Sequence, residues 1–350
     1  MTPIDDYRGL RLDLPGTWVA DVLELGYDPN LPDDHGDYLL TLACEYRELK
    51  SVCLALAAGA NPNRPNAAGN SPLLCVLAAG VDGDGGHPDV PDIVRALLLA
   101  GANASVSDAW DIPVSHVLVR GKDAIRPSLE SFRQWRAARV GVANPSVMSN
   151  PVWDWLVRTR LSAYSAVDVM QAGHASAEDG PGWSFHRFGC STTVLPDGRV
   201  VFIAGEHEDF YDSDFFIYND VVVAHSDGSL DIYGYPREVF PPTDSHTATL
   251  LPGCIVLIGS IGYPDSRRYG QTQVLTLSLN TFEIQAMPTS GGSPGWIHGH
   301  SATLSPDGQA IVVSGGRIEL AGDKSAHDNG DEWALDVTTW SWSCRRLSKT

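Results

Sequence analysis

The feature that most constrains this chain is a 33-residue internal repeat near its N-terminus. Gly26–Asn30 (GYDPN) recurs as Gly59–Asn63 (GANPN), and the related segment Gly101–Ala104 follows after a longer interval. A second marker has the same 33-residue offset, because Gly36–Leu40 matches Gly69–Leu73. A repeat of this length is typical of solenoids, in which each unit buries its apolar face only against its neighbours.

Apolar stretches with helical character precede each repeated glycine, the residue type that most often follows a helix C-terminus. These stretches are Trp18–Leu25, Val52–Ala58 and Ile93–Ala100. Two further runs, Leu40–Cys44 and Leu73–Ala79, predict short buried helices after a turn. We expect a capping unit to start near Pro15, and a last helix, Pro127–Arg139, to close the stack.

The tetrapeptide Ser71–Leu74 (SPLL) and the segment Leu97–Asn103 (LLLAGAN) are the motifs by which residues 15–140 resemble ankyrin repeats. The match is imperfect, because Tyr38 and Ile112 stand where that family has threonine, and about nine extra residues lengthen the middle repeat. The resemblance implies paired helices, projecting turns and a protein-binding role. It implies no catalytic pocket.

The projecting turns of such a stack supply the first candidate contacts with a partner. A tryptophan flanked by acidic residues on an exposed turn is a reasonable binding hot spot. The alternative is that Trp110 packs beneath its own turn. The candidate partner-binding residues of the first and third turns are Asp33, Asp34, Asp37, Asp108, Trp110 and Asp111.

A second and longer repeat occupies the C-terminal part. Gly189–Gly198 matches Gly299–Gly308, and Ser245–Gly253 lies midway between them. Each copy precedes a short apolar run that ends in glycine, then a polar loop and two more predicted strands. The pattern over residues 186–347 resembles the Kelch repeat, whose double glycine is kept at Gly315 and Gly316.

The predicted fold is therefore multidomain: an α-helical ankyrin solenoid followed by an all-β, Kelch-like domain. We assign residues 1–142 to the first, residues 143–185 to a connecting helix and linker, and residues 186–350 to about three blades. Three blades are fewer than the four to eight of a typical closed propeller. Either residues 143–170 supply an odd element, or the propeller is incomplete and its edge needs cover.

The segment between the second and third predicted strands of the first blade, EHEDFYDSDFF, mixes carboxylates with aromatic side chains. Such a loop suits an acidic protein that binds a basic one. A metal site is the weaker interpretation, because the segment has neither a His-Glu-x-x-His pair nor a calcium-loop motif; a solvated loop is the plainest. The candidate partner-binding residues here are Glu206, Glu208, Asp209, Phe210, Tyr211, Asp212, Asp214 and Phe215.

No motif for catalysis or cofactor binding is recognisable. The sequence has no Walker loop, dinucleotide fingerprint or Cys-x-x-Cys pair, and no Gly-x-Ser-x-Gly segment lies between a predicted strand and a predicted helix, where it would frame a nucleophile. His246 and His300 occupy matching repeat positions, which the Kelch pattern explains as structural. We predict that the chain is not an enzyme and that it needs no metal or cofactor.

Charge and the lack of targeting signals narrow the function further. The 43 acidic and 24 basic residues give a formal net charge of −19, which disfavours direct nucleic-acid or anionic-membrane binding. No signal peptide or membrane span is evident, so we expect a cytoplasmic protein. The specific hypothesis is an immunity protein (antitoxin) that occludes a basic bacterial toxin such as a secreted nuclease. The alternatives are an intracellular scaffold or regulatory adaptor, and a degenerate propeller enzyme acting on carbohydrate.

Overall fold

The computed structural model describes residues 6–13, 16–78, 89–103, 118–119, 124–173, 181–207, 214–323 and 325–345. The chain divides into two compact units, residues 1–120 with 194–198, and residues 121–193 with 199–350. The predicted boundary lies after residue 142, whereas the first unit ends at Arg120. The segment from 121 to 142 therefore belongs to the β-rich unit.

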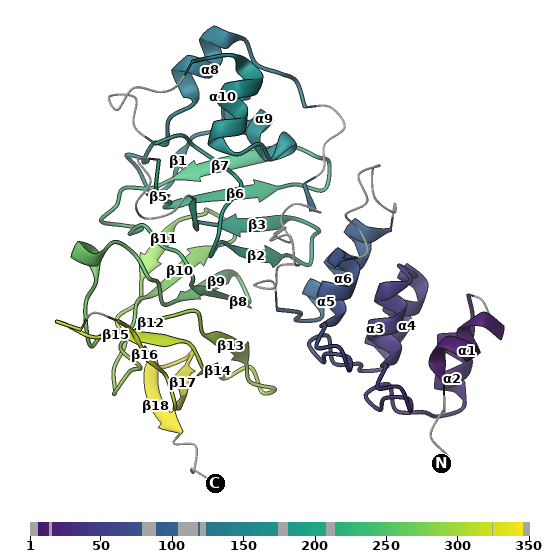
Figure 1. Cartoon of the computed structure of the whole chain (residues 1–350). Coiled ribbons are helices and arrows are strands. Elements are labelled where there is room, and N and C mark those ends of the chain that lie inside the picture. The colour runs from purple at the N-terminus through teal and green to yellow at the C-terminus, as the bar shows by residue number, and fades with distance from the viewer. Residues whose placement is uncertain are drawn as a thin grey trace. The chain divides into compact units, whose positions relative to one another are not determined.

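The first unit is a series of short helices, shown in purple and blue in Figure 1. Each helical stretch predicted from the repeat overlaps one of them. Helix α3 contacts both α4 and α5, and α6 contacts α4 and α5, so consecutive helix pairs stack on one another. The described helices are α1 (Tyr7–Asp13), α2 (Trp18–Glu24), α3 (Leu39–Glu45), α4 (Leu49–Ala57), α5 (Pro72–Ala78) and α6 (Val90–Leu99).

The repeated glycines end three of these helices. Gly26, Gly59 and Gly101 have φ angles of 79°, 88° and 90°, a left-handed conformation that side chains disfavour. Each donates its N–H to a carbonyl in the last turn of the preceding helix, as Gly59 does to Leu56 at 3.0 Å. The sequence repeat is therefore also a repeat of backbone conformation.

The second unit contains three successive antiparallel sheets, one for each predicted repeat of the C-terminal part. The strands of the first sheet are β2 (Ser191–Val194), β3 (Val200–Ile203), β6 (Asp220–Ala224) and β7 (Leu230–Gly234), with β1 (Ser146–Val147) added beside β7. Those of the second are β8 (Thr247–Leu251), β9 (Cys254–Ile258), β10 (Val274–Ser278) and β11 (Ile284–Ala286). Those of the third are β13 (Ser301–Leu304), β14 (Ala310–Ser314), β17 (Glu332–Asp336) and β18 (Ser341–Arg345).

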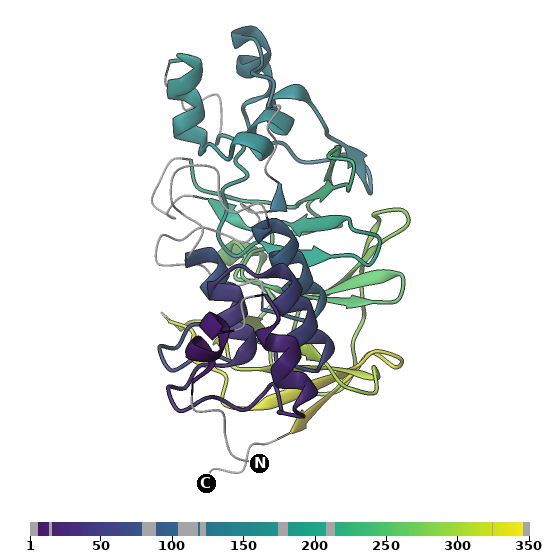
Figure 2. The same cartoon turned by 90° about the vertical axis from the view of Figure 1, so that its right-hand side faces the viewer.

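Two smaller sheets are inserted at the ends of these larger ones. They are β4 (Glu206–His207) with β5 (Phe216–Ile217), and β12 (Trp296–His298) with β15 (Arg317–Glu319) and β16 (His327–Asp328). Figures 1 and 2 both show the three larger sheets following one another in chain order. Among the described residues, strand pairing stays within each sheet and forms no closed barrel.

In the described part of the β-rich unit, three helices precede strand β2: α8 (Leu129–Trp135), α9 (Pro151–Thr159) and α10 (Ala163–Met170). Helix α8 falls within the predicted range Pro127–Arg139, but it packs in the β-rich unit and does not close the helical stack. Its Phe132 ring meets Trp155 of α9 edge-on, with ring centroids 6.2 Å apart. Trp153 of α9 stacks on Trp183 at 4.7 Å, so these helices share a core with the segment leading into the first sheet.

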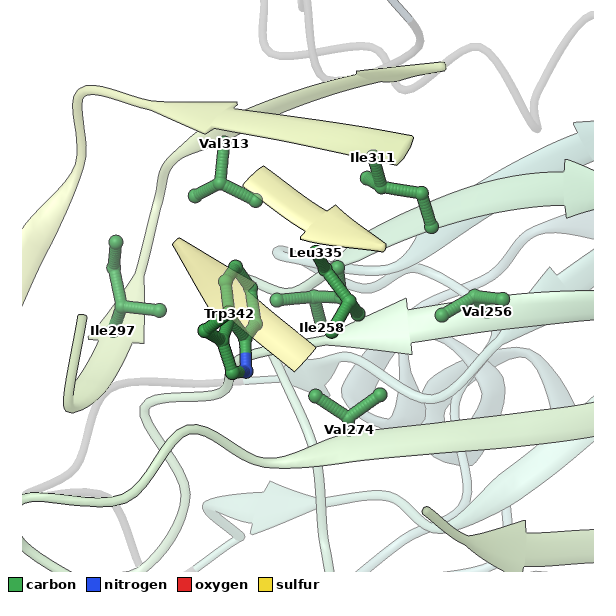
Figure 3. Packing of buried hydrophobic residues seen from close by; sticks show 8 residues of the cluster. All are labelled: Val256, Ile258, Val274, Ile297, Ile311, Val313, Leu335 and Trp342. Atoms are coloured by element: carbon green, nitrogen blue, oxygen red, sulfur yellow. The ribbon is translucent and has the colours of Figure 1, made fainter. Parts of the chain in front are cut away.

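The second and third sheets pack face to face around one apolar cluster (Figure 3). Every second residue of a strand points to the same face, so alternate residues of β9 and β14 reach the cluster. Trp342 of β18 fills its centre and is 5% exposed. The members of the cluster are Val256, Ile258, Val274, Ile297, Ile311, Val313, Leu335 and Trp342.

Candidate functional site

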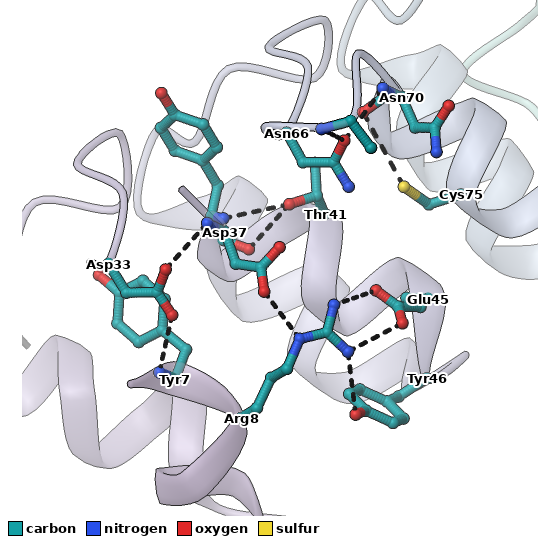
Figure 4. Close-up of polar contacts among 12 residues, drawn as sticks. Tyr7, Arg8, Asp33, Asp37, Thr41, Glu45, Tyr46, Asn66, Asn70 and Cys75 are labelled. Atoms are coloured by element: carbon teal, nitrogen blue, oxygen red, sulfur yellow. Dashed lines mark hydrogen bonds and ion pairs between the residues drawn. The ribbon is translucent and has the colours of Figure 1, made fainter. Parts of the chain in front are cut away.

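The first turn of the helical unit is held by two carboxylates that the sequence analysis places among the partner-binding residues (Figure 4). Asp33 Oδ1 accepts hydrogen bonds from the N–H groups of His35 (3.0 Å) and Asp37 (2.9 Å). Asp33 Oδ2 accepts one from the N–H of Tyr7 at 3.0 Å. Asp33 is 5% exposed, so its carboxylate is committed to holding the turn and the start of α1.

Asp37 is also buried, and it pairs with Arg8 of α1. Arg8 Nε lies 2.7 Å from Asp37 Oδ2, and the Arg8 Nη atoms donate to both oxygens of Glu45 at 2.8 and 2.9 Å. Hydrogen bonds to Glu45 and Asp37 raise the pKa of Arg8, so the guanidinium stays charged. Of the three candidate carboxylates of this turn, Asp34 alone is exposed.

The second turn repeats this construction without charge. Asn66 Oδ1 accepts hydrogen bonds from the N–H groups of Ala68 (3.1 Å) and Asn70 (3.0 Å), as Asp33 does in the first turn. The alignment of Asp33 with Asn66, and of Asp37 with Asn70, is the sequence signal for a shared turn role. Asn and Asp recur at such positions because their short side chains mimic a backbone acceptor.

A ladder of asparagine side chains joins successive turns. Asn30 donates from Nδ2 to the carbonyl of Gly59 at 2.9 Å and accepts the N–H of Asn61 at 2.8 Å. Asn63 makes the same pair of bonds one repeat later, to the carbonyl of Gly101 (2.8 Å) and the N–H of Asn103 (2.7 Å). The turns therefore hold one another through bonds that a partner protein does not need to supply.

The segment from α2 to the first turn leaves apolar and acidic side chains in solvent. Leu25 is 64% exposed and Leu31 is 57% exposed, while Glu24, Asp28 and Asp34 are exposed beside them in the chain. We call these five residues the 24–34 surface. Sequence reasoning finds Asp34 but misses the two leucines, which look like ordinary core residues in the repeat pattern.

The other predicted contacts fall partly outside the described residues. Those outside are Asp108, Trp110, Asp111, Glu208, Asp209, Phe210, Tyr211 and Asp212. Glu206 lies in β4, where its backbone exchanges hydrogen bonds with Phe188 at 2.8 and 2.9 Å. Asp214 and Phe215 are half-buried just before β5. The described part thus brings Glu206, Asp214 and Phe215 to the same small sheet.

Phe215 borders a groove of about 1440 Å³ in the β-rich unit. Arg237, Arg267 and Arg268 also line it, together with two carboxylates, Glu238 and Asp265. Sequence reasoning misses these arginines because the groove is built from four separate connecting segments. The sequence signal that could have drawn attention to them is the scarcity of basic residues, since only 24 of the 350 residues are lysine or arginine.

The two repeated histidines sit between neighbouring sheets. His246 Nε2 lies 2.8 Å from Ser191 Oγ, and His300 Nε2 lies 2.9 Å from Thr247 Oγ1, so each imidazole bonds to the first strand of the preceding sheet. Burial, and then the neighbouring His300, lower the pKa of His246 to about 3. Burial, and then His298, lower the pKa of His300 to about 4. Both rings are therefore neutral at physiological pH.

A buried ion pair anchors the entry to the first sheet. Both Nη atoms of Arg187 bond to the carboxylate of Asp220, at 2.5 and 2.9 Å, and Trp183 Nε1 donates to the same carboxylate at 2.8 Å. The guanidinium carbon of Arg187 lies 3.4 Å from the ring centroid of Tyr218. This cluster is sealed from solvent, since Arg187 is 5% and Asp220 is 3% exposed.

Within the described ranges, no three His, Cys, Asp or Glu side chains gather in a way that could hold a metal ion. Among the helices that the structure describes, none has the length and apolarity needed to cross a bilayer. A scan against models of known protein families found no match for this sequence, and a search of curated proteins found none either.

Proposed function

We propose that the chain binds a basic protein, and that it is an immunity protein which occludes a basic bacterial nuclease toxin. The observation that carries this proposal is the 24–34 surface, in which two exposed leucines and three exposed carboxylates lie within eleven residues of sequence. The charge of the helical unit supports it, because residues 1–120 contain 17 acidic and seven basic residues.

The proposed architecture is an ankyrin-like stack followed by an open, Kelch-like array of blades. The repeated turn bonds of Asp33 and Asn66, and the repeated ladder bonds of Asn30 and Asn63, support the first part. Three successive four-stranded antiparallel sheets support the second. In such stacks the projecting turns are the accessible contact elements.

The exposed residues of the 24–34 surface have two different physical roles. Leu25 and Leu31 supply apolar area that a partner would bury, at about 25 cal/mol per Å². Asp28, Asp34 and Glu24 supply a negative field that steers a basic partner and raises its association rate. Asp33 and Asp37 contribute charge to that field, but their carboxylates stay bonded inside the fold.

The first test is to identify the partner by pull-down and to measure its association rate constant as a function of salt. We expect a basic partner whose association slows at least tenfold between about 50 and 500 mM salt, because screening shortens the reach of the field. A partner with an acidic surface, or an association rate that salt does not change, would refute the proposal.

The second test locates the contact. Leu31→Ser combined with Asp34→Asn should weaken the complex at least tenfold, since it removes both an apolar and an ionic contact. Leu320→Ser is the matched control, because Leu320 is an exposed leucine of the other unit (44%). Equal affinities for both variants would show that the 24–34 surface is not the contact.

The third test addresses the nuclease. If the partner cleaves DNA, titration with this chain should abolish cleavage at a molar ratio near one. Full cleavage activity in the saturated complex would show that the chain binds its partner without inhibiting it. That result would refute the immunity role and leave the protein-binding proposal standing.

A further inference from the structure

The groove in the β-rich unit lies at one end of the sheets. Its walls come mainly from four segments that follow the second and fourth strands of the first two large sheets: Phe215–Phe216 after β3 and β4, 237–242 after β7, 263–273 after β9 and 286–293 after β11. Pro181 and Trp296 also line the groove. In an antiparallel meander these strands end on the same side, so four segments far apart in sequence meet there. This placement explains why no single motif marks the groove.

One basic side chain of the groove, Arg267, is fixed before any ligand arrives. Arg267 donates from Nε to the carbonyl of Ile261 at 3.0 Å, and its Nη1 lies 2.8 Å from Glu319 Oε2. Trp296 Nε1 donates to the same Ile261 carbonyl at 2.9 Å. Because such bonds lock both side chains, little conformational entropy remains to be lost on binding.

The aromatic wall is similarly fixed. The hydroxyl of Tyr263 accepts the N–H of Ile217 at 2.9 Å, which holds the ring at the groove. Phe215 meets that ring edge-on, with centroids 5.9 Å apart at 89°. Both rings are half-buried, so each still offers apolar surface to a ligand.

Two further arginines, Arg237 and Arg268, are exposed at the groove, and neither forms a salt bridge within the described residues. Glu238 and Asp265 stand among them on the same lining. Arginine forks match carboxylates bidentately, whereas side-chain carboxylates accept hydrogen bonds from hydroxyl groups. The two carboxylates disfavour a densely charged polyphosphate, so the lining suits a ligand with spaced negative charges and many hydroxyls.

We propose that this groove binds an acidic oligosaccharide, a chain of sugar rings that carry carboxylates. The volume exceeds the roughly 300 to 1,000 Å³ common for single small ligands, which favours several linked rings. The arginines take the carboxylates, and the rings of Tyr263 and Phe215 pack against the apolar faces of the sugars. This site is independent of the proposed protein contact, which lies in the helical unit.

Isothermal titration calorimetry of the full chain with trigalacturonate tests the proposal against a neutral twin, the methyl ester of the same trisaccharide. We expect the acid to bind and the ester to bind at least tenfold more weakly. No binding of the acid, or equal binding of acid and ester, would overturn the proposal. This comparison requires no variant, so it does not depend on how substitutions affect folding.

Arg237→Gln and Arg268→Gln should each weaken binding of the acid about tenfold. Arg133→Gln should leave it unchanged, because Arg133 is an exposed arginine of the same unit on α8, away from the groove lining. Unchanged binding in both groove variants would overturn the assignment. Tetraglutamate or inorganic tripolyphosphate binding as tightly as trigalacturonate would overturn the saccharide class. None of these probes tests the protein partner, so the two proposals fail separately.

Discussion

Replacing His246 and His300 together by glutamine should flatten the acid side of the stability curve of the β-rich unit. Both imidazoles are buried between sheets, with pKa values of about 3 and about 4 in the folded protein. An unfolded histidine titrates near 6.5. Glutamine keeps a polar group near the position of Nε2 but does not titrate in this range.

The direction follows from which state takes up protons first. Above pH 6.5 both states hold neutral imidazoles, so these groups do not change the free energy of unfolding with pH. Below pH 6.5 the two histidines bind protons in the unfolded chain but not in the folded chain. The free energy of unfolding therefore falls until the pH reaches the pKa of each histidine in the folded protein. Protonation would also place a charged ring where Nδ1 of each histidine has no hydrogen-bond partner among the described residues.

The magnitude is large enough to measure. Each pH unit between the unfolded and folded pKa costs about 1.4 kcal/mol per histidine. At pH 4.5 each histidine therefore lowers the free energy of unfolding by roughly 2 to 3 kcal/mol, and the pair by about 5 kcal/mol. The total free energy of unfolding of an ordinary domain is only about 5 to about 15 kcal/mol.

The assay is urea unfolding between pH 7.5 and 4.5, followed by tryptophan fluorescence. The double variant should be less stable than the original at pH 7.5, because the new side chains fit the two sites less well. The difference should shrink, or change sign, as the pH falls to 4.5. His327→Gln is the control, because the His327 side chain is 57% exposed. Parallel curves for the double variant and the original chain would show that these histidines titrate normally, and would refute the reasoning.

Three other substitutions test separate parts of the fold by urea unfolding. Asn63→Ala should cost the helical unit about 1 to 2 kcal/mol, because two inter-turn hydrogen bonds are lost; no change would mean that the ladder is not stabilising. Asp220→Asn should cost about 3 to 5 kcal/mol by leaving Arg187 buried without its counter-charge, and a smaller loss in Arg187→Met with Asp220→Asn would confirm that origin. Gly141→Ala should destabilise the β-rich unit, because a Cβ there would overlap the carbonyl oxygen of Gly234; native stability would contradict that contact.

Much of the secondary structure follows from local sequence. The apolar runs before Gly26, Gly59 and Gly101 form helices. Each helix ends just before its glycine because glycine adopts positive φ at little cost. Strands β6 and β17 lie where the repeat pattern predicts a strand after the polar loop of the first and third copies. Periodicity and turn residues are local signals, so they can be read without tertiary contacts.

The division between units and the roles of the acidic residues are not local. Helix α8 packs in the β-rich unit and not in the helical unit, because its Phe132 contacts Trp155. No periodic pattern in the sequence predicts that contact. In the sequence, Asp33 and Asp37 look like exposed turn residues. In the folded chain, Asp33 accepts a hydrogen bond from the Tyr7 N–H and Asp37 pairs with Arg8. The net charge therefore overstates the number of carboxylates that a partner can reach.

One edge of each of the three sheets, at β7, β11 and β18, is covered, and each in a different way. Strand β1 adds to β7, while Asn144 bonds to both the N–H and the carbonyl of Ile284 in β11 at 2.8 Å. Ser290 exchanges backbone hydrogen bonds with residues 340 and 342 beside β18. Capping an edge in this way removes unpaired groups that would otherwise pair with another chain.

One face of the third sheet carries a different side chain from the equivalent face of the second sheet. The positions of Val256 and Ile258, which pack against the third sheet, correspond by strand register to Val312 and Ser314 in that sheet. These two residues point away from the apolar cluster and are partly exposed. A terminal repeat needs a more polar outer face to remain stable in water. The serine in place of isoleucine makes this face of the third sheet more polar than the equivalent face of the second sheet.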